Sequence, residues 1–281
     1  MGNREGDLWA IIVGGSSGFG LASAKALAEK GFGVCVVHRD RRGAMQRIEQ
    51  NFSEIKRHSG RFLSFNVDAL SAEARDAVLC DIAAYVGTQK IRLLLHSIAY
   101  GSVKPLAPLS SASLDENVVA AANNVLQDDE LMLTLDAMAG SLWSWTREIF
   151  ERRLFTQDAR VIGLTSEGSS VAWRCYAAVG AAKAALEAIS RSIAKELGPH
   201  GVRSNIIQAG ITDTPALRLI PGCEQMLAQA RARNPLGRLT QPQDIAKIVA
   251  FLASDEAAWI NGSVIRVDGG EHICGSMQEG K

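Results

Sequence analysis

Short apolar runs alternate with amphipathic stretches along most of the chain. Residues 8–13 form the first apolar run, and residues 18–30 then repeat apolar side chains at helical spacing. Runs of about four to seven apolar residues are typical of strands covered on both faces, because neither face meets water. Further strands are predicted at 34–37, 61–67, 91–95, 160–164, 202–207 and 263–267, and further helices at 41–58, 72–85, 131–153, 177–197 and 242–252.

The alternation of strands and helices predicts an α/β fold. We expect a Rossmann-type, doubly wound parallel sheet of about seven strands with helices on both faces. No proline- or serine-rich linker divides the chain, so residues 1–281 are predicted to form one domain with its core at about 10–270. Two stretches fit the alternation poorly, namely residues 117–130 and residues 212–239.

The charge balance removes several classes of function. Thirty basic residues balance thirty acidic ones, whereas a general nucleic-acid binder would carry a clear positive excess. No apolar run reaches the roughly 18–20 residues of a membrane span. The five cysteines form no Cys-x-x-Cys pair and the five histidines are scattered, so no metal site is predicted. We therefore expect a cytoplasmic protein that acts without metal, nucleic acid or membrane.

A glycine-rich turn joins the first strand to the first helix. It reads Gly14-Gly15-Ser16-Ser17-Gly18-Phe19-Gly20. Glycines in this spacing let the backbone turn tightly, approach a pyrophosphate and pack helix against strand. The start of the helix adds free N–H groups and the positive end of a dipole. We predict that the turn, including Ser16, Ser17 and Phe19, binds a dinucleotide; the alternative is a tight turn without a ligand.

The end of the second strand indicates which dinucleotide binds. An acidic residue there would hold the ribose hydroxyls of NAD, but this chain has His38 and Arg39, followed by Asp40. The planar guanidinium of Arg39 suits a 2′-phosphate, and Ser17 adds a hydroxyl. NADPH is therefore the predicted cofactor. Asp40 keeps NADH open as the less favoured choice, and a solvated basic loop is the alternative interpretation.

Tyr176 and Lys183 form the candidate catalytic pair. They lie seven positions apart on a predicted helix, about 700° of rotation, so both side chains share one face. The ammonium is expected to lower the pKa of the phenol by favouring phenolate. Ser166 ends the fifth predicted strand, and ligands of open parallel sheets bind beyond such strand ends. The alternative is a packing tyrosine beside a surface lysine.

Together these motifs resemble the short-chain dehydrogenase/reductase superfamily. The same holds for Asn205-x-x-x-Ala209-Gly210 and for the segment Val-Asp-Gly-Gly that begins at Val267. The commoner pattern in this superfamily is Tyr-x-x-x-Lys, which would place the tyrosine at Val179. The spacing from Tyr176 to Lys183, and His-Ser-Ile-Ala-Tyr-Gly at 96–101, instead resemble the enoyl-acyl carrier protein reductase branch, in the subgroup that keeps the ordinary glycine pattern.

The resemblance implies a reaction and a role for several residues. NADPH would reduce the carbon–carbon double bond of a 2-enoyl thioester carried by acyl carrier protein or coenzyme A. Tyr176 would hydrogen-bond the enolate oxygen, Lys183 the nicotinamide ribose, and Ser166 would position the carbonyl. Residues 117–130 would be an insertion and 212–239 a substrate lid. Further cofactor contacts would come from Asn66, Val67, Ser97, Ile98, Ala99, Gly210, Thr212 and Thr214.

Other features leave alternatives open. A 3-oxoacyl or carbonyl reductase of the same fold, and a non-catalytic NADP-binding protein, are the competing functions. The family implies a homo-oligomer, dimer or tetramer, with the alanine-rich helix at 177–194 as an interface. Four arginines of the lid region form either a portal for an acidic carrier protein or a solvated helix face: Arg218, Arg231, Arg233 and Arg238. Trp143, Trp145 and Trp173 line an acyl pocket or pack in the core.

Overall fold

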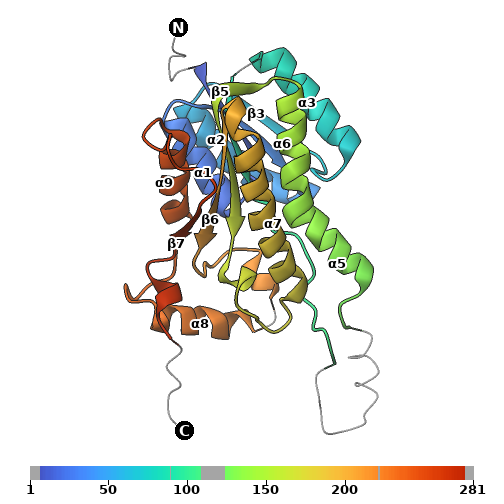
Figure 1. Ribbon diagram of the computed structural model, residues 1–281, viewed down its shortest axis with the longest axis vertical. Coiled ribbons are helices and arrows are strands. Elements are labelled where there is room, and N and C mark those ends of the chain that lie inside the picture. Colours follow the sequence, from blue (N-terminus) through green and yellow to red (C-terminus); the bar gives the residue numbers. More distant parts are fainter. Residues whose placement is uncertain (1–6, 89, 109–123, 221, 276–281) are drawn as a thin grey trace.

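A parallel sheet of seven strands forms the centre of the computed structural model (Figure 1), which describes residues 7–88, 90–108, 124–220 and 222–275. The strand order is β3-β2-β1-β4-β5-β6-β7. All six strand pairs are parallel. The strands are β1 (Trp9–Val13), β2 (Gly33–His38), β3 (Phe62–Asn66), β4 (Ile91–His96), β5 (Phe155–Thr165), β6 (Val202–Ala209) and β7 (Val264–Val267).

Helices cover both faces of the sheet, which confirms the predicted fold class. One face packs against α1 (Gly18–Glu29), α2 (Met45–His58) and α9 (Pro242–Ala253). The other packs against α3 (Ala72–Val86), α6 (Ser141–Glu151) and α7 (Ala177–Glu196). The strands β1, β2 and β4 are buried along their whole length, as the continuous apolar runs predict. None of the described helices is both long and apolar enough to cross a membrane.

The sequence pattern misplaced two boundaries. Strand β5 begins at Phe155, five residues before the predicted start. The sequence pattern missed this part of the strand because the residues after Phe155 are mostly polar. Phe155 pairs with Ile91, and a register shift follows. The single helix predicted at 131–153 is instead α5 (Asp128–Leu135), a π-turn (Asp136–Gly140) and α6. Of the expected insertion at 117–130, residues 117–123 lie outside the described residues, and 128–130 form the acidic first turn of α5.

The predicted lid at 212–239 contains a short 3₁₀ turn, Leu217–Leu219, and the helix α8 (Cys223–Arg233). Figure 1 shows α8 lying crosswise beneath the lower ends of α7 and β7. Since the strands are parallel and the lid segment follows the carboxyl end of β6, α8 lies at the edge of the sheet where ligands of such folds bind.

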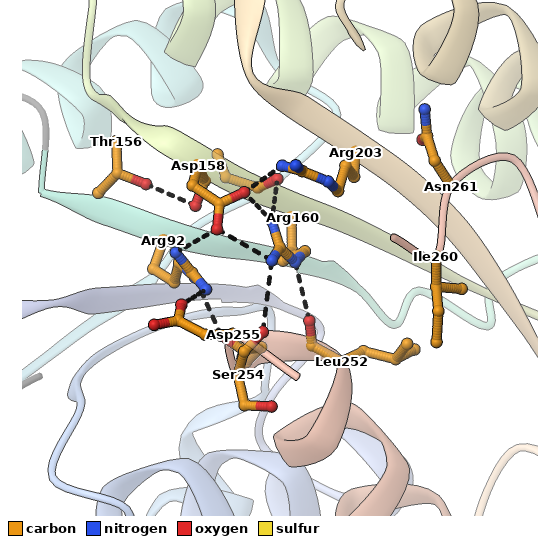
Figure 2. Close-up of polar contacts among 12 residues, drawn as sticks. Arg92, Thr156, Asp158, Arg160, Arg203, Leu252, Ser254, Asp255, Ile260 and Asn261 are labelled. Atoms are coloured by element: carbon orange, nitrogen blue, oxygen red, sulfur yellow. Dashed lines mark hydrogen bonds and ion pairs between the residues drawn. The ribbon is translucent and has the colours of Figure 1, made fainter. Parts of the chain in front are cut away.

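A network of arginines anchors the opposite edge of the sheet (Figure 2). Arg92 on β4 and Arg160 on β5 both pair with Asp158, at 2.8 Å and 2.5 Å, and Arg203 on β6 pairs with the same carboxylate. The same guanidinium groups donate to the last carbonyls of α9: Arg160 Nε to Leu252 at 3.0 Å and Arg92 Nε to Ala253 at 2.9 Å. Helix ends leave such carbonyls without partners, so the network ties α9 to three strands.

Candidate active site

The predicted site residues gather beyond the carboxyl ends of the strands, around a cavity of about 300 Å³. Those that line the cavity are Phe19, Ser97, Ile98, Ala99, Ser166, Tyr176, Lys183, Gly210, Thr212 and Thr214. The others lie in the glycine-rich turn or at the ends of β2 and β3, outside the lining: Gly14, Ser16, Ser17, Gly18, Gly20, His38, Arg39, Asn66 and Val67. The predicted site residues therefore gather at the edge of the sheet that the sequence indicated.

The glycine-rich turn has the close backbone approaches that its sequence predicts. Gly14 has φ +90°, and a Cβ there would lie 2.5 Å from the carbonyl oxygen of Ser97. A Cβ on Gly20 would overlap the carbonyl of Gly14, so a larger residue would push α1 away from the turn. Ser17 is the N-cap of α1, and its side chain makes no capping hydrogen bond. The first N–H groups of α1 are thus left for another acceptor, which fits a pyrophosphate.

Polar contacts hold the loop after β2. Arg39 Nη1 pairs with Asp68 Oδ2 at 2.6 Å, and its guanidinium lies 5.2 Å from the ring centre of Tyr100. The Asp40 carboxylate contacts His38 Nδ1 at 2.9 Å, and the side-chain amide of Asn66 bonds the backbone of Asp40 at both its N–H and its carbonyl. Asp40 is therefore engaged with the protein, while Arg39 remains half-exposed.

Tyr176 and Ser166 are brought together as expected. Tyr176 is the N-cap residue of α7, and its hydroxyl lies 3.3 Å from Ser166 Oγ. Burial raises the pKa of Tyr176, and the hydrogen bond with Ser166 offsets this only in part. The expectation that Lys183 lowers the pKa of this phenol was therefore wrong. Lys183 Nζ instead donates to the carbonyl of Leu164 at 2.8 Å, and the buried phenol stays protonated at neutral pH.

Lys183 lines the cavity but is itself buried among polar side chains. Burial lowers the pKa of Lys183 to about 8, against the opposing charge of Glu187. Glu187 accepts a hydrogen bond from Thr165 Oγ1 at 2.7 Å. His96 is kept neutral, because burial and the charge of Lys183 lower its pKa to about 3. Its Nε2 lies 2.6 Å from Ser141 Oγ, which links β4 to the first residue of α6.

One side of the cavity is apolar. Val179, the residue at the commoner tyrosine position, is buried and packs with Met138 and Ala182, against Val103 and Tyr176. Met138 comes from the π-turn (Asp136–Gly140), so this turn presents a side chain to the cavity. No hydroxyl stands at position 179, and Tyr176 is the phenol nearest to Ser166 among the described residues.

Comparison with known proteins places this site in a family. Residues 13–272 match the family model described as enoyl-(acyl carrier protein) reductase. The chain belongs to this family. It is thus an oxidoreductase of the short-chain dehydrogenase/reductase superfamily, in the enoyl reductase branch.

Individual relatives span several activities. The chain is 29% identical over 271 residues to cis-4-hydroxycyclohexanecarboxylate dehydrogenase of Sinomonas cyclohexanicum, covering 96% of this chain and 98% of that protein. It is also 29% identical over 272 residues to the 3-oxoacyl-[acyl-carrier-protein] reductase FabG of Escherichia coli, covering 96% and 99%. The crystal structure of the Bacillus cereus enoyl-acyl carrier protein reductase with NADP⁺ and indole naphthyridinone matches with a TM-score of 0.79, 26% identity and coverage of 95% and 97%.

In this enoyl reductase family member, a charged cluster that sequence reasoning missed also lines the cavity. Arg233, in the last turn of α8, pairs through Nη2 with Glu167 at 2.6 Å and with Glu271 at 2.7 Å. Glu271 also accepts the N–H of Ile211 at 3.0 Å. Nothing in the sequence pairs these residues, since 38 and 66 positions separate Arg233 from its partners.

The arginines considered as a basic portal are largely neutralised, as a solvated helix face would be. Arg218 pairs with Asp213 at 2.6 Å and Arg238 with Asp244 at 2.6 Å, in addition to the pairing of Arg233. The tryptophans also separate in the structure. Trp173 lines the cavity, whereas Trp145 is fully buried in the core, so its packing interpretation is confirmed.

Proposed function

We propose that this protein is an NADPH-dependent reductase of the carbon–carbon double bond of a 2-enoyl thioester, carried by acyl carrier protein or coenzyme A. The position of the phenol carries the proposal. Tyr176 provides the hydroxyl beside Ser166, seven residues before Lys183, while Val179 contributes only an apolar wall. That spacing is the one that resembles the enoyl reductases, and the family match supports it.

The side chains are suited to stabilise a developing oxyanion. A bound nicotinamide cofactor supplies the hydride. Tyr176 Oη donates a hydrogen bond to the thioester oxygen as negative charge grows there, and Ser166 positions the same oxygen. Because its pKa is raised, the phenol remains protonated and able to donate. Lys183 holds the ribose and keeps positive charge at the base of the site.

NADPH is the proposed cofactor because of Arg39. The glycine turn and the uncapped start of α1 suit a pyrophosphate, and the related Bacillus cereus enzyme was crystallised with NADP⁺. The half-exposed guanidinium of Arg39 suits the 2′-phosphate. The contact of Asp40 with His38 favours this arrangement, since that carboxylate already has a partner within the protein. We also propose a homo-oligomer, dimer or tetramer, as the superfamily implies.

One alternative has a specific observation in its favour. Ser166 and Tyr176 lie close enough to hold a ketone oxygen together, and the relative from Escherichia coli is named a 3-oxoacyl reductase. A 3-oxoacyl thioester reductase is therefore the second candidate.

The two candidates are separated by substrate. NADPH oxidation is measured with trans-2-enoyl and 3-oxoacyl thioesters of matched chain and carrier. We expect turnover of the enoyl substrate, a loss of about 100-fold in kcat for Tyr176→Phe, and no change for Tyr85→Phe on the outer surface of α3. Turnover of the 3-oxoacyl substrate alone would refute the proposal.

A further inference from the structure

The cavity has a polar end, built around Arg233. The arginine comes from the lid helix α8, while Glu167 follows β5 and Glu271 lies in the short helical turn Glu271–Ile273 after β7. The ring of Trp173 lies 5.9 Å from the guanidinium carbon. Arg233, Glu167, Glu271 and Trp173 all line the same cavity as Ser166 and Tyr176.

The guanidinium is fixed in place but only partly used. Both of its bonds to glutamate run through Nη2. A guanidinium has five N–H donors, and among the described residues no acceptor bonds Nε or Nη1 of Arg233. Neither nitrogen is a fully buried atom without a partner, and Arg233 is one of the residues that line the cavity. Three N–H groups are thus oriented by the protein and available to a ligand.

The charge of the cluster selects the kind of acceptor. Two carboxylates surround one guanidinium, so the three side chains together carry a net negative charge. An anionic group of a ligand would be repelled by Glu167 and Glu271, whereas a neutral carbonyl oxygen would accept from Nε or Nη1 without that penalty. An amide carbonyl is the strongest neutral acceptor of this kind, and its flat plane can also lie on the ring of Trp173.

The apolar and the polar parts of the cavity lining suit different parts of the substrate. Val103, Met138 and Val179 form the apolar end beside Tyr176 and suit the hydrocarbon of an acyl chain. Glu167 directly follows Ser166, the residue assigned to the thioester carbonyl, so the polar end begins next to the reacting group. The part of a thioester that leaves the carbonyl on its sulfur side carries amides, in coenzyme A and on carrier proteins alike.

We propose that Arg233 is a specificity-determining residue that donates a hydrogen bond to an amide carbonyl in the carrier arm of the thioester substrate. The inference rests on the proposed function, because it takes the substrate to be a thioester. Arg233 also joins α8 to Glu167 and Glu271, so arm binding and lid position depend on the same side chain.

Four trans-2-butenoyl thioesters test the assignment. Their thiols are ethanethiol, which has no amide, N-acetylcysteamine, which has one, pantetheine and coenzyme A; the same acyl group on an acyl carrier protein is the fifth substrate. Arg233→Lys keeps a cation between the two glutamates but removes the planar donor set. Relative to its effect on the ethanethiol thioester, we expect Arg233→Lys to lower kcat/KM about tenfold for every amide-bearing substrate. This is the loss expected when one charge-assisted hydrogen bond is removed.

Arg47→Lys is the control, since Arg47 is exposed on α2 and lies outside the cavity lining; it should leave all five values within twofold. Equal losses with and without an amide would show a purely structural role and would overturn the proposal. A loss confined to coenzyme A would also overturn it, because the contact would then be with the nucleotide. Should Arg233→Lys fail to fold, the unsubstituted enzyme decides: its kcat/KM must rise at least fivefold from the ethanethiol to the N-acetylcysteamine thioester.

Failure of the proposed function gives a different result. An enzyme that reduces no enoyl thioester but reduces 3-oxobutanoyl thioesters refutes enoyl reduction only. The same series of carriers bearing 3-oxobutanoyl then measures the dependence on Arg233, with the same expected and contradicting outcomes.

Discussion

At the scale of single residues, burial determines how the polar groups of the site behave. Tyr176 and Lys183 both line the cavity, yet their pKa values are set by surroundings that their spacing in the sequence does not contain. Burial raises the pKa of the phenol and lowers that of the ammonium to about 8. The pair is therefore arranged so that both protons are present near neutral pH, and the lysine is the first of the two to lose its proton.

The pKa of Lys183 predicts an alkaline limit to cofactor use. The ammonium is charged below about pH 8 and neutral above it. The pH dependence of kcat/KM for NADPH reports the protonation states of the free enzyme. We expect kcat/KM to decrease above about pH 8, with a slope that approaches a tenfold decrease per pH unit. Steady-state rates from pH 6 to 10 measure this, and Lys183→Met should give a low, flat profile. A limb that begins only near pH 10 would contradict the assignment.

Arg39 carries the proposed choice of NADPH. Its guanidinium is half-exposed and pairs with Asp68, an exposed ion pair of the kind that contributes about 0–1 kcal/mol. Replacing Asp68 by a 2′-phosphate as the partner of Arg39 therefore costs little free energy. We expect Arg39→Leu to weaken NADPH binding 10- to 100-fold and NADH binding less than threefold, by calorimetry. Arg41→Leu, two residues along, is the control, and equal losses for both nucleotides would argue against the 2′-phosphate contact.

At the scale of elements, the start of α7 depends on the turn that follows β5. A Cβ on Gly180 would lie 2.7 Å from the carbonyl of Gly168, and a Cβ on Gly168 would overlap the ring of Tyr176. The two glycines let helix and turn approach closely enough for Tyr176 to meet Ser166. Similarly, the π-turn between α5 and α6 brings Met138 to the cavity.

Gly168→Ala should therefore impair catalysis more than folding. The added methyl group pushes the ring of Tyr176 away from Ser166, so we expect kcat to fall at least tenfold while Tm changes by only a few degrees. Enoyl reductase rates and thermal unfolding measure the two effects. Gly60→Ala is the control, because a Cβ there meets nothing within 4 Å. Unchanged kcat in Gly168→Ala would mean that the phenol need not stay at Ser166.

At the scale of the whole molecule, the two edges of the sheet have separate roles. The carboxyl edge holds the cavity, the glycine turn and α8. The amino edge holds the network around Asp158, where Arg160 is buried and three guanidinium groups share one carboxylate (Figure 2). Partial burial raises the pKa of Asp158, but its hydrogen bond from Arg160 and the three positive charges outweigh this and hold the pKa below its usual value.

Asp158→Asn should lower stability without changing the site. Removal of the carboxylate leaves buried arginine charge uncompensated, and we expect a loss of about 2 kcal/mol, below the 3–5 kcal/mol of a fully buried pair. Because the folded pKa is depressed, the stabilisation is present above the unfolded pKa near 3.8 and is lost as pH falls below it. Urea unfolding at pH 7 and pH 3 measures both, and the difference between variant and parent should shrink at pH 3.

A substitution at Asp255 distinguishes the contribution of this network from that of an exposed ion pair. Asp255 pairs with Arg92 but is largely exposed, so Asp255→Asn should cost less than about 1 kcal/mol. Kinetic constants should stay within twofold for both variants, since the network lies at the edge remote from the cavity. Equal destabilisation by the two substitutions would contradict the special role of Asp158.

The sequence by itself determined the α/β class, because the class follows from periodicity. From local spacing it also predicted the Tyr176–Lys183 pair and the edge of the sheet at which the candidate site lies. Only the tertiary structure decided what depends on contacts between distant segments. The pairing of Arg233 with Glu167 and Glu271 joins three elements, and the raised pKa of Tyr176 results from burial by several others. The π-turn was equally invisible, because a helix with one widened turn keeps nearly the same hydrophobic period.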